Sequence, residues 1–346
     1  MEYNIKLIFD KELDLEIDNF LKYLKDSGYY GSTVKNKNRL DDISFDNIAD
    51  SGLVLKTIPY RTKLNLQKNN NISKLTSKRC ALCEAIQGKN KPYPLNLSKG
   101  LLWRGYIIRP NDFPYMNDHL LILSSDHNHG YDKNVGSQDI VTENNKVLMD
   151  MIDFYKLLNY KGTMFFNGLA GNSQLHFHFH YTTETLPIQK YLYNYNMEEK
   201  KDNLNQFVTK NQTNLFLFNS REYYCFNGIF LYGKLKGLKD DVFKLASKIK
   251  SKKKEYNIVF LPKNNNDFSE GNLSVVLYMR DVKNLKKNDP NLGASIISGH
   301  YTDPSLNKKH LLKKEVNKEK IEKFIRRVCS ITVVKPNMDI INSVLK

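Results

Sequence analysis

Residues 171–181 read Gly-Asn-Ser-Gln-Leu-His-Phe-His-Phe-His-Tyr, and this stretch decides the expected fold. Successive side chains of a β-strand point to opposite faces of a sheet. His176, His178 and His180 are therefore expected on one face, with the two phenylalanines between them on the other, against a core. Buried imidazoles need hydrogen-bond partners or a ligand. The pattern predicts a functional strand, and a surface histidine cluster or an adventitious metal patch are the alternatives.

A glycine-rich turn leads into the histidines. The turn begins at Asn167, contains Gly168 and Gly171, and includes the hydroxyl group of Ser173. Turns of this kind can direct backbone N–H groups at an anion, so a phosphate group is expected at the start of the histidine strand. An ordinary Asn/Gly turn between strands is the alternative. The position of the turn, directly ahead of three alternating histidines, favours the phosphate site.

In this stretch the chain resembles the histidine-triad (HIT) superfamily, and within it the larger branch that is similar to galactose-1-phosphate uridylyltransferase and includes GDP-hexose and dinucleoside polyphosphate phosphorylases. The matching motif is Gly-x-Ser-x-x followed by the three alternating histidines. Upstream, Asn111-Asp112-Phe113-Pro114 and the run from His119 to His127 are similar to the family's preceding strand pair. The resemblance covers about residues 78–190 clearly and about 212–330 more loosely.

The resemblance implies a role for each matching residue. His178 is expected to attack the α-phosphate of a nucleotide and to carry a covalent nucleotidyl group, since neutral imidazole is a good nucleophile near neutral pH. His180 is expected to contact phosphoryl oxygens or to orient the nucleophile. Ser173, with the backbone of Gly171 and Asn172, is expected to stabilise charge on the transferred phosphate.

Substrate contacts are implied at further positions. Asn111 and Asp112 align with a contact to ribose, and Asn167 lies near the family's substrate-binding asparagine. In the second half, Arg280 or Lys263 is expected to meet distal phosphates or a sugar. A solvated basic residue at a strand end is the alternative for each of these two.

One position departs from the family pattern. Transferases and phosphorylases of the branch usually carry Gln where this chain has His180, whereas HIT hydrolases carry His. The acceptor of the nucleotidyl group is therefore left open among phosphate, a sugar phosphate and water.

The chain has four cysteines, and two of them form Cys80-Ala-Leu-Cys83. This spacing lets both thiolates bind one metal ion. His127 and His176 stand where zinc-binding members of the family place their ligands, so the resemblance implies a structural zinc site made of Cys80, Cys83, His127 and His176. His129 and His119 are nearby substitutes for His127 in this set. A redox role needs a thioredoxin-like βαβ context, which is absent from the sequence, and two ordinary thiols are the remaining alternative.

Length and composition limit the classes of protein to which this chain can belong. A chain of 346 residues with 40% hydrophobic and 12% aromatic residues can bury a sizeable core and exceeds one typical domain. No apolar stretch reaches membrane-spanning length, and the first residues lack a signal-peptide profile. Few, unevenly spaced cysteines favour a reducing, cytoplasmic location.

The net charge of +16 suggests a polyanion such as nucleic acid as a partner. The basic residues are mostly lysines scattered among asparagines, which is typical of a compositional bias rather than of a binding surface. A general positive field would still attract an anionic nucleotide.

The expected architecture is α+β. It consists of two tandem HIT-like repeats, each an antiparallel sheet with helices on one side. The expected boundaries are an N-terminal accessory segment over 1–78, the catalytic repeat over 79–190, a connector over 191–211 and a degenerate second repeat over 212–346. Apolar periodicity predicts helices over 13–24, 136–160, 238–251 and 315–330. It predicts second-half strands over 215–218, 223–226, 228–232, 256–262, 273–280 and 294–299.

The sequence therefore predicts a nucleotidyltransferase or phosphorylase that acts on a nucleoside diphosphate sugar or a dinucleoside polyphosphate, with phosphate or a sugar phosphate as acceptor. Three alternatives stay open: a HIT-type nucleotide hydrolase, a protein that processes nucleic-acid ends with its basic surface, and a scaffold that has lost catalysis. No membrane partner is expected, and a homodimer is compatible with the sequence.

Overall fold

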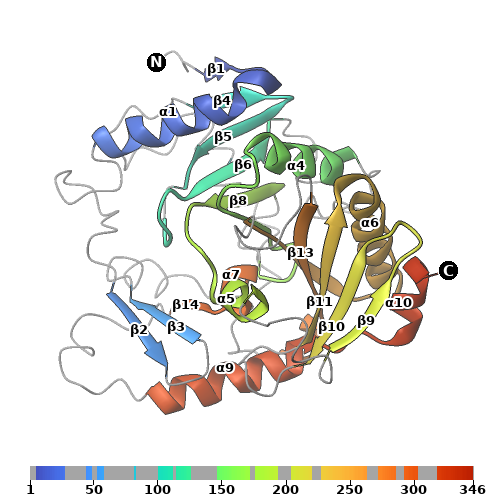
Figure 1. Cartoon of the computed structure of the whole chain (residues 1–346). Coiled ribbons are helices and arrows are strands. Elements are labelled where there is room, and N and C mark those ends of the chain that lie inside the picture. The colour runs from blue at the N-terminus through green and yellow to red at the C-terminus, as the bar shows by residue number, and fades with distance from the viewer. Residues whose placement is uncertain are drawn as a thin grey trace.

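The structure is a computed structural model that describes residues 5–27, 44–48, 53–57, 82, 100–111, 114–125, 146–171, 176–193, 204–219, 227–262, 272–285, 292–302 and 318–345. Within these residues, one twelve-stranded sheet extends through both halves of the chain, and a three-stranded sheet accompanies it (Figure 1). The α+β class that the sequence predicts is confirmed. The two halves contribute to one continuous sheet rather than to a sheet each.

The large sheet has its strands in the following order: β1 (Ile5–Leu7), β4 (Gly100–Trp103), β5 (Tyr106–Pro110), β6 (Leu120–Ser124), β8 (His178–Thr182), β7 (Thr163–Phe166), β12 (Glu255–Leu261), β13 (Asn272–Arg280), β11 (Asn227–Lys234), β10 (Asn214–Asn219) and β9 (Leu204–Val208). β15 (Val333–Val334) pairs with β13. β1 runs parallel to β4, and the other pairs are antiparallel. The small sheet contains β14 (His300–Thr302), β3 (Leu53–Thr57) and β2 (Ser44–Ile48).

The two halves of the large sheet follow the same strand order. The first half reads β4-β5-β6-β8-β7 and the second reads β9-β10-β11-β13-β12, so β7 and β12 meet at the centre. The register matches as well: Phe165 pairs with His180 and with Val259, and Val259 pairs with Val276. By this register Val276 occupies the position of His180, and Ser274 occupies the position of His178. No histidine stands at either matching position of the second half.

Helices cover both faces of the sheet. α1 (Leu13–Asp26), α4 (Lys146–Leu157), α6 (Leu235–Ser251) and α10 (Met338–Leu345) pack into the core on the face that carries Phe179. α5 (Pro187–Tyr193), α7 (Ala294–Ile297) and α9 (Lys318–Thr332) belong to the core on the opposite face, which carries Phe165. The expectation of helices on one side only was therefore wrong. Two short 3-10 helices, η1 (Asp10–Glu12) and η7 (Val282–Asn284), complete the described elements.

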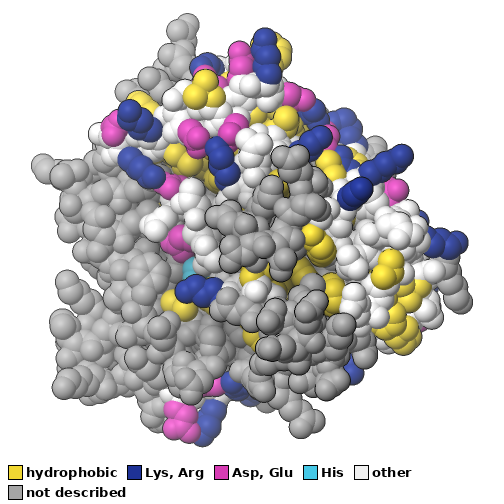
Figure 2. Space-filling model, viewed as in Figure 1, with side chains coloured by type: hydrophobic (Ala, Val, Ile, Leu, Met, Phe, Trp, Pro, Cys, Tyr) yellow, Lys and Arg dark blue, Asp and Glu magenta, His cyan; other side chains and the backbone are white. Residues whose placement is uncertain are grey.

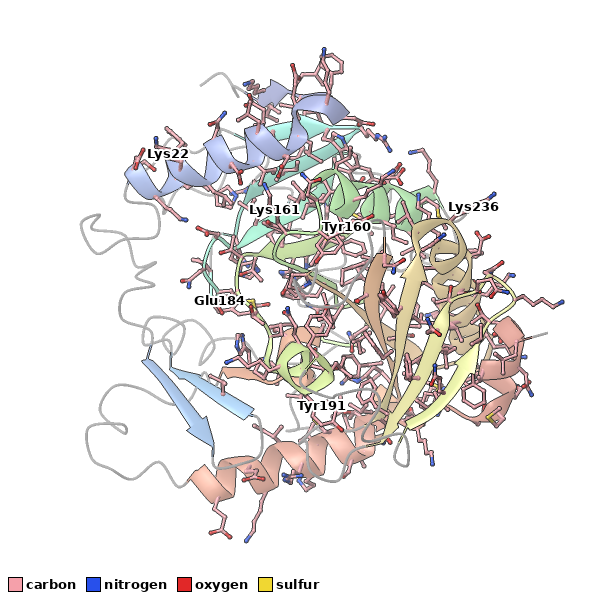
Figure 3. The ribbon with its side chains drawn as sticks, in the orientation of Figure 1. Lys22, Tyr160, Lys161, Glu184, Tyr191 and Lys236 are labelled. Atoms are coloured by element: carbon pink, nitrogen blue, oxygen red, sulfur yellow. The ribbon has the colours of Figure 1, made fainter. Side chains whose placement is uncertain are left out.

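The described part of the N-terminal segment is integrated into the first half. β1 extends the sheet, and α1 buries its apolar stripe in the same core as the phenylalanines of the histidine strand (Figure 1). The stripe has the spacing of one helical face, which is why the sequence predicted this helix. Lys161, labelled in Figure 3, also pairs with Asp14 of α1 at 2.8 Å.

Ile17→Ala is expected to lower the free energy of unfolding by about 2–4 kcal/mol, because Ile17 is 1% exposed and its loss leaves a cavity in the core. Leu15→Ala on the same helix should change it by no more than about 0.5 kcal/mol, because Leu15 is 64% exposed. Denaturant unfolding of the two variants measures this difference. Equal stabilities would show that α1 is not part of the folded unit.

Several second-half elements lie where the sequence predicted them, including α6, α9, β10, β11, β12 and β13. The predicted strand over 294–299 was wrong, because this segment contains helix α7. A short apolar run does not distinguish a strand from a buried helical turn. Residues 223–226 lie outside the described residues.

None of the described helices combines the length and the apolar character that a membrane crossing requires. The expected cytoplasmic location stays a prediction.

Candidate active site

Strand β8 places two histidines side by side on one face of the sheet. His178 lies opposite Leu123, and His180 lies opposite Leu121 and Phe165, so their side chains point to the same side. Their ring centroids are 5.0 Å apart, and both residues are buried. The phenylalanines on either side of His178 belong to the core of the other face, as the alternation predicts. β8 begins only at His178, so His176 precedes the strand.

His178 is held in a defined protonation state. Its Nδ1 is 2.7 Å from the carbonyl oxygen of His176. A carbonyl oxygen only accepts hydrogen bonds, so Nδ1 carries the proton and Nε2 carries the lone pair. Burial lowers the pKa of His178 to about 4, so the ring is neutral at pH 7.

His180 is fixed on three sides by protein groups. Its Nδ1 is 3.0 Å from Nε2 of His119, and its Nε2 is 3.3 Å from the side-chain amide nitrogen of Asn167. Its ring stacks on Phe165 with centroids 4.6 Å apart and an interplanar angle of 6°. These contacts suit a group that orients its neighbours. The predicted contact of His180 with phosphoryl oxygens stays a prediction.

Two further residues of this face were not assigned to catalysis from the sequence, although His119 was a substitute for His127 in the predicted zinc site. His119 is fully buried just before β6 and reaches His180. Arg109 of β5 pairs with Leu121, which pairs with His180, so Arg109 lies in the same row of the same face and is 8% exposed. Arg109 is placed on this face by the pairing of β5, β6 and β8, which the sequence alone does not give.

The glycine turn lies against the second half of the chain. Gly168 and Gly171 have φ values of +57° and +93°, which favour glycine. A Cβ added to Gly171 would lie 2.3 Å from Cα of Gly293. The two backbones therefore touch. Asn172 and Ser173 lie outside the described residues, so their contacts with phosphate stay predictions.

Asn167 joins the two halves through its side chain and its backbone. Its Oδ1 accepts a hydrogen bond from the backbone N–H of Ala294 at 2.7 Å. The side-chain amide of Asn257 donates to the carbonyl oxygens of Asn167 and Ala170, at 2.5 Å and 2.6 Å. Sequence reasoning assigned nothing to Asn257, although a fully buried asparagine has to find several partners.

Arg280 is fully buried behind this turn. Its Nη1 donates to Oδ1 of Asn257 at 2.6 Å and to the carbonyl oxygen of Leu292 at 2.7 Å, and Nε donates to the carbonyl oxygen of Thr332 at 3.3 Å. Burial lowers its pKa to about 9, so the guanidinium stays charged at pH 7. The geometry thus gives Arg280 a role in holding the turn and lends no support to the predicted contact with a distal phosphate. Lys263 lies outside the described residues.

Asn111 is buried beside His119. Its amide nitrogen is 3.4 Å from Nδ1 and 3.3 Å from Nε2 of the His119 ring. Asp112 lies outside the described residues. The predicted ribose contacts of both residues stay predictions.

Only one of the four predicted zinc ligands is described. Nε2 of His176 is 2.8 Å from the carbonyl oxygen of Ser124. Metal-binding histidines commonly donate one ring N–H to a backbone carbonyl and bind the metal with the other nitrogen, so Nδ1 of His176 fits the predicted role. Cys80, Cys83 and His127 lie outside the described residues, and the described part of the chain contains no cluster of three His, Cys, Asp or Glu that could hold a metal.

On the face shown in Figure 2, described lysines and arginines occur at several separate places, together with some acidic groups. The predicted nucleic-acid partner stays an open alternative.

No protein-family model and no curated protein sequence matches this chain. Among solved structures, the yeast Ap4A phosphorylase Apa2 in complex with AMP has a TM-score of 0.48 at 14% identity, covering 91% of this chain and 94% of Apa2. A uridylyltransferase mutant has a TM-score of 0.30 at 11% identity, covering 65% of this chain and 88% of that one. Yeast Apa2 in complex with Ap4A has a TM-score of 0.51 at 12% identity, covering 95% of this chain and 100% of Apa2. At the level of the fold, the chain is therefore similar over nearly its whole length to a dinucleoside polyphosphate phosphorylase, which is the branch that its sequence resembles.

Proposed function

We propose that this protein is a nucleotidyltransferase or phosphorylase in which His178 attacks the α-phosphate of a nucleoside diphosphate sugar or a dinucleoside polyphosphate. The observation that carries the proposal is the state of His178, which is neutral, buried and oriented by the His176 carbonyl with its lone pair on Nε2. Similarity to the fold of an Ap4A phosphorylase supports it.

The chemistry proceeds in two displacements. Nε2 of His178 attacks phosphorus, the bond from phosphorus to the leaving oxygen breaks, and a nucleotidyl-histidine forms. The ring then carries partial positive charge, and the hydrogen bond from Nδ1–H to the His176 carbonyl strengthens. An oxygen of phosphate or of a sugar phosphate attacks the same phosphorus, and the P–N bond breaks to restore the neutral ring. The glycine turn and Ser173 contact the transferred phosphate in both steps.

The matching strand order and register of the two halves support an origin as tandem HIT-like repeats. In this view the second repeat has Ser274 and Val276 at the positions of His178 and His180. It would supply support for the site rather than a second nucleophile.

A hydrolase is the second candidate, because His180 stands where transferases of the branch usually carry Gln. Both ring nitrogens of His180 contact protein groups, His119 on one side and Asn167 on the other. A ring in this arrangement is poorly placed to activate a water molecule. This observation favours transfer to phosphate or a sugar phosphate.

Intact-protein mass spectrometry after incubation with a panel of nucleotide sugars and dinucleoside polyphosphates tests the proposal. The expected result is a mass increase equal to one nucleotidyl group, which is discharged by inorganic phosphate. Labelled phosphate that enters a nucleoside diphosphate identifies a phosphorylase. Release of nucleoside monophosphate alone identifies a hydrolase, and no adduct with any substrate contradicts the covalent route.

The formation of this adduct is expected to change little between about pH 8 and about pH 5.5 and to decline as the pH approaches 4. The reason is that the pKa of His178 is lowered to about 4, so the neutral nucleophile persists in mild acid. A histidine with an ordinary pKa of about 6.5 would be only about 10% neutral at pH 5.5. Rapid-quench labelling across this range distinguishes the two cases, with circular dichroism to confirm that the protein stays folded.

We also propose a structural zinc ion held by Cys80, Cys83, His127 and His176, which would fix the segment before β4 to the start of the histidine strand. Elemental analysis of the purified protein is expected to find about one zinc ion per chain, and Cys80→Ser is expected to remove it. Protein without zinc, or an unchanged zinc content in the variant, would contradict the site.

A further inference from the structure

His119 and His180 form a pair that lies between two N–H donors. At one end the side-chain amide nitrogen of Asn167 is 3.3 Å from Nε2 of His180. At the other end the backbone N–H of Tyr115 points at Nδ1 of His119 across 3.5 Å. The two rings meet in the middle, where Nδ1 of His180 is 3.0 Å from Nε2 of His119. His119 and His180 are 0% and 6% exposed, so water competes little for their ring nitrogens.

The two rings cannot satisfy both donors at once. Each neutral imidazole carries one N–H. If Asn167 and Tyr115 both donate, the outer nitrogens both carry lone pairs and both protons lie on the inner nitrogens. Two N–H groups would then face each other across the 3.0 Å contact. Therefore either the hydrogen bond from Asn167 or the one from Tyr115 cannot form.

The distances indicate that the hydrogen bond from Asn167 forms and the one from Tyr115 does not. The inner contact is the shortest of the three, as a hydrogen bond requires, and the contact with Tyr115 is the longest. The Asn167 amide cannot turn over, because its Oδ1 accepts from the N–H of Ala294 at 2.7 Å. Its nitrogen therefore donates to Nε2 of His180, and the proton of His180 lies on Nδ1 and is donated to His119. The Asn111 amide nitrogen, near both nitrogens of His119, can donate to whichever carries the lone pair.

The second half of the chain holds Asn167 in this orientation. Ala294 begins α7, and Asn257 on β12 binds the backbone carbonyls of Asn167 and Ala170. Asn257 is in turn bound by the buried guanidinium of Arg280, which also binds the carbonyl of Leu292. Three elements of the second half, α7, β12 and β13, thus hold Asn167 of the first half in place.

We propose that Asn167 is a positioning residue that selects the Nδ1–H tautomer of His180. The second half of the chain holds the Asn167 amide in the orientation that this selection requires. The consequence for catalysis rests on the proposed nucleotidyl transfer. With its proton directed at His119, the His180 ring is held beside His178 at a centroid distance of 5.0 Å. In the other tautomer an N–H of His180 would meet the N–H of Asn167, and the ring would be pushed from this position.

Nitrogen-15 NMR of protein labelled at histidine reads the tautomer directly. Comparison with His180→Gln assigns the His180 signals. In the unsubstituted protein, Nε2 of His180 is expected to have the shift of an unprotonated ring nitrogen. In Asn167→Ala the donor is lost, and Tyr115 then favours a lone pair on Nδ1 of His119, so the proton of His180 is expected on Nε2. In Asn167→Asp a carboxylate accepts that proton, and the same switch is expected.

Asn214→Asp, a half-buried asparagine of β10 at the far side of the sheet, makes the same chemical change and is expected to leave the His180 shifts unaltered. A protonated Nε2 in the unsubstituted protein, or no switch in folded Asn167→Ala and Asn167→Asp, overturns the inference. The rate of adduct formation in Asn167→Ala is expected to fall about tenfold or more with little change in apparent KM. The NMR result is independent of the reaction: a tautomer switch in a protein that forms no adduct would reject the proposed function and keep the role of Asn167.

Discussion

Gly171→Ala is expected to abolish adduct formation and to lower the free energy of unfolding by about 3 kcal/mol or more. The new Cβ would lie 2.3 Å from Cα and 2.6 Å from the nitrogen of Gly293, and 2.6 Å from the carbonyl oxygen of Leu292. These are backbone atoms, so no side-chain rotation relieves the overlap. The residue also has a φ of +93°, which costs an L-residue about 1–2 kcal/mol on its own. The two halves have to move apart at the point where Ala294 holds Asn167.

Gly105→Ala is the matched control for this prediction. Gly105 has a similar φ of +82°, but the nearest atom to an added Cβ is Oγ of Ser125 at 3.9 Å. Its cost should be limited to the backbone strain of about 1–2 kcal/mol, with adduct formation retained. Denaturant unfolding and labelling of both variants separate the strain from the overlap. Equal losses in the two variants would show that the contact between Gly171 and Gly293 does not matter.

Local patterns predicted much of this fold. The helical spacing of Leu13, Ile17 and Leu24 predicted α1, and the alternation around His178 predicted which side chains share a face of the sheet. These features depend on near neighbours in the sequence, where periodicity carries the information.

The partners of each strand could not be predicted in the same way. The pairing of β7 with β12 merges the halves into one sheet, and only this arrangement brings Ala294 to Asn167. Arg280 illustrates the consequence. Its sequence context at a strand end suggested a solvent-facing or ligand-facing cation, whereas the fold buries it behind the glycine turn with Asn257 as a partner. His119 was likewise visible in the sequence, but its contact with His180 depends on the pairing of β6 with β8.

His178→Gln is expected to eliminate the nucleotidyl adduct and to reduce turnover by about 10⁴-fold or more, because an amide has no lone pair able to form the phosphorus–nitrogen bond. His180→Gln makes the same chemical change two residues away on the same face of the strand. It should still form the adduct, at a reduced rate, because an amide can keep a hydrogen bond to His119 or to Asn167. Intact mass and steady-state turnover measured on both variants separate the nucleophile from the residue that orients it.

The variants His178→Gln and His180→Gln also test which acceptor receives the nucleotidyl group. If His180 directs the nucleotidyl group to water, His180→Gln should increase the fraction of product formed by phosphorolysis, because Gln is the residue that transferases of the branch usually carry there. If His180 only positions its neighbours, as its contacts with His119 and Asn167 indicate, the product ratio should stay constant while the rate falls. An adduct that persists in His178→Gln would place the nucleophile elsewhere. An adduct lost equally in both variants would mean that the two rings act as one unit, because residues that act together have non-additive effects.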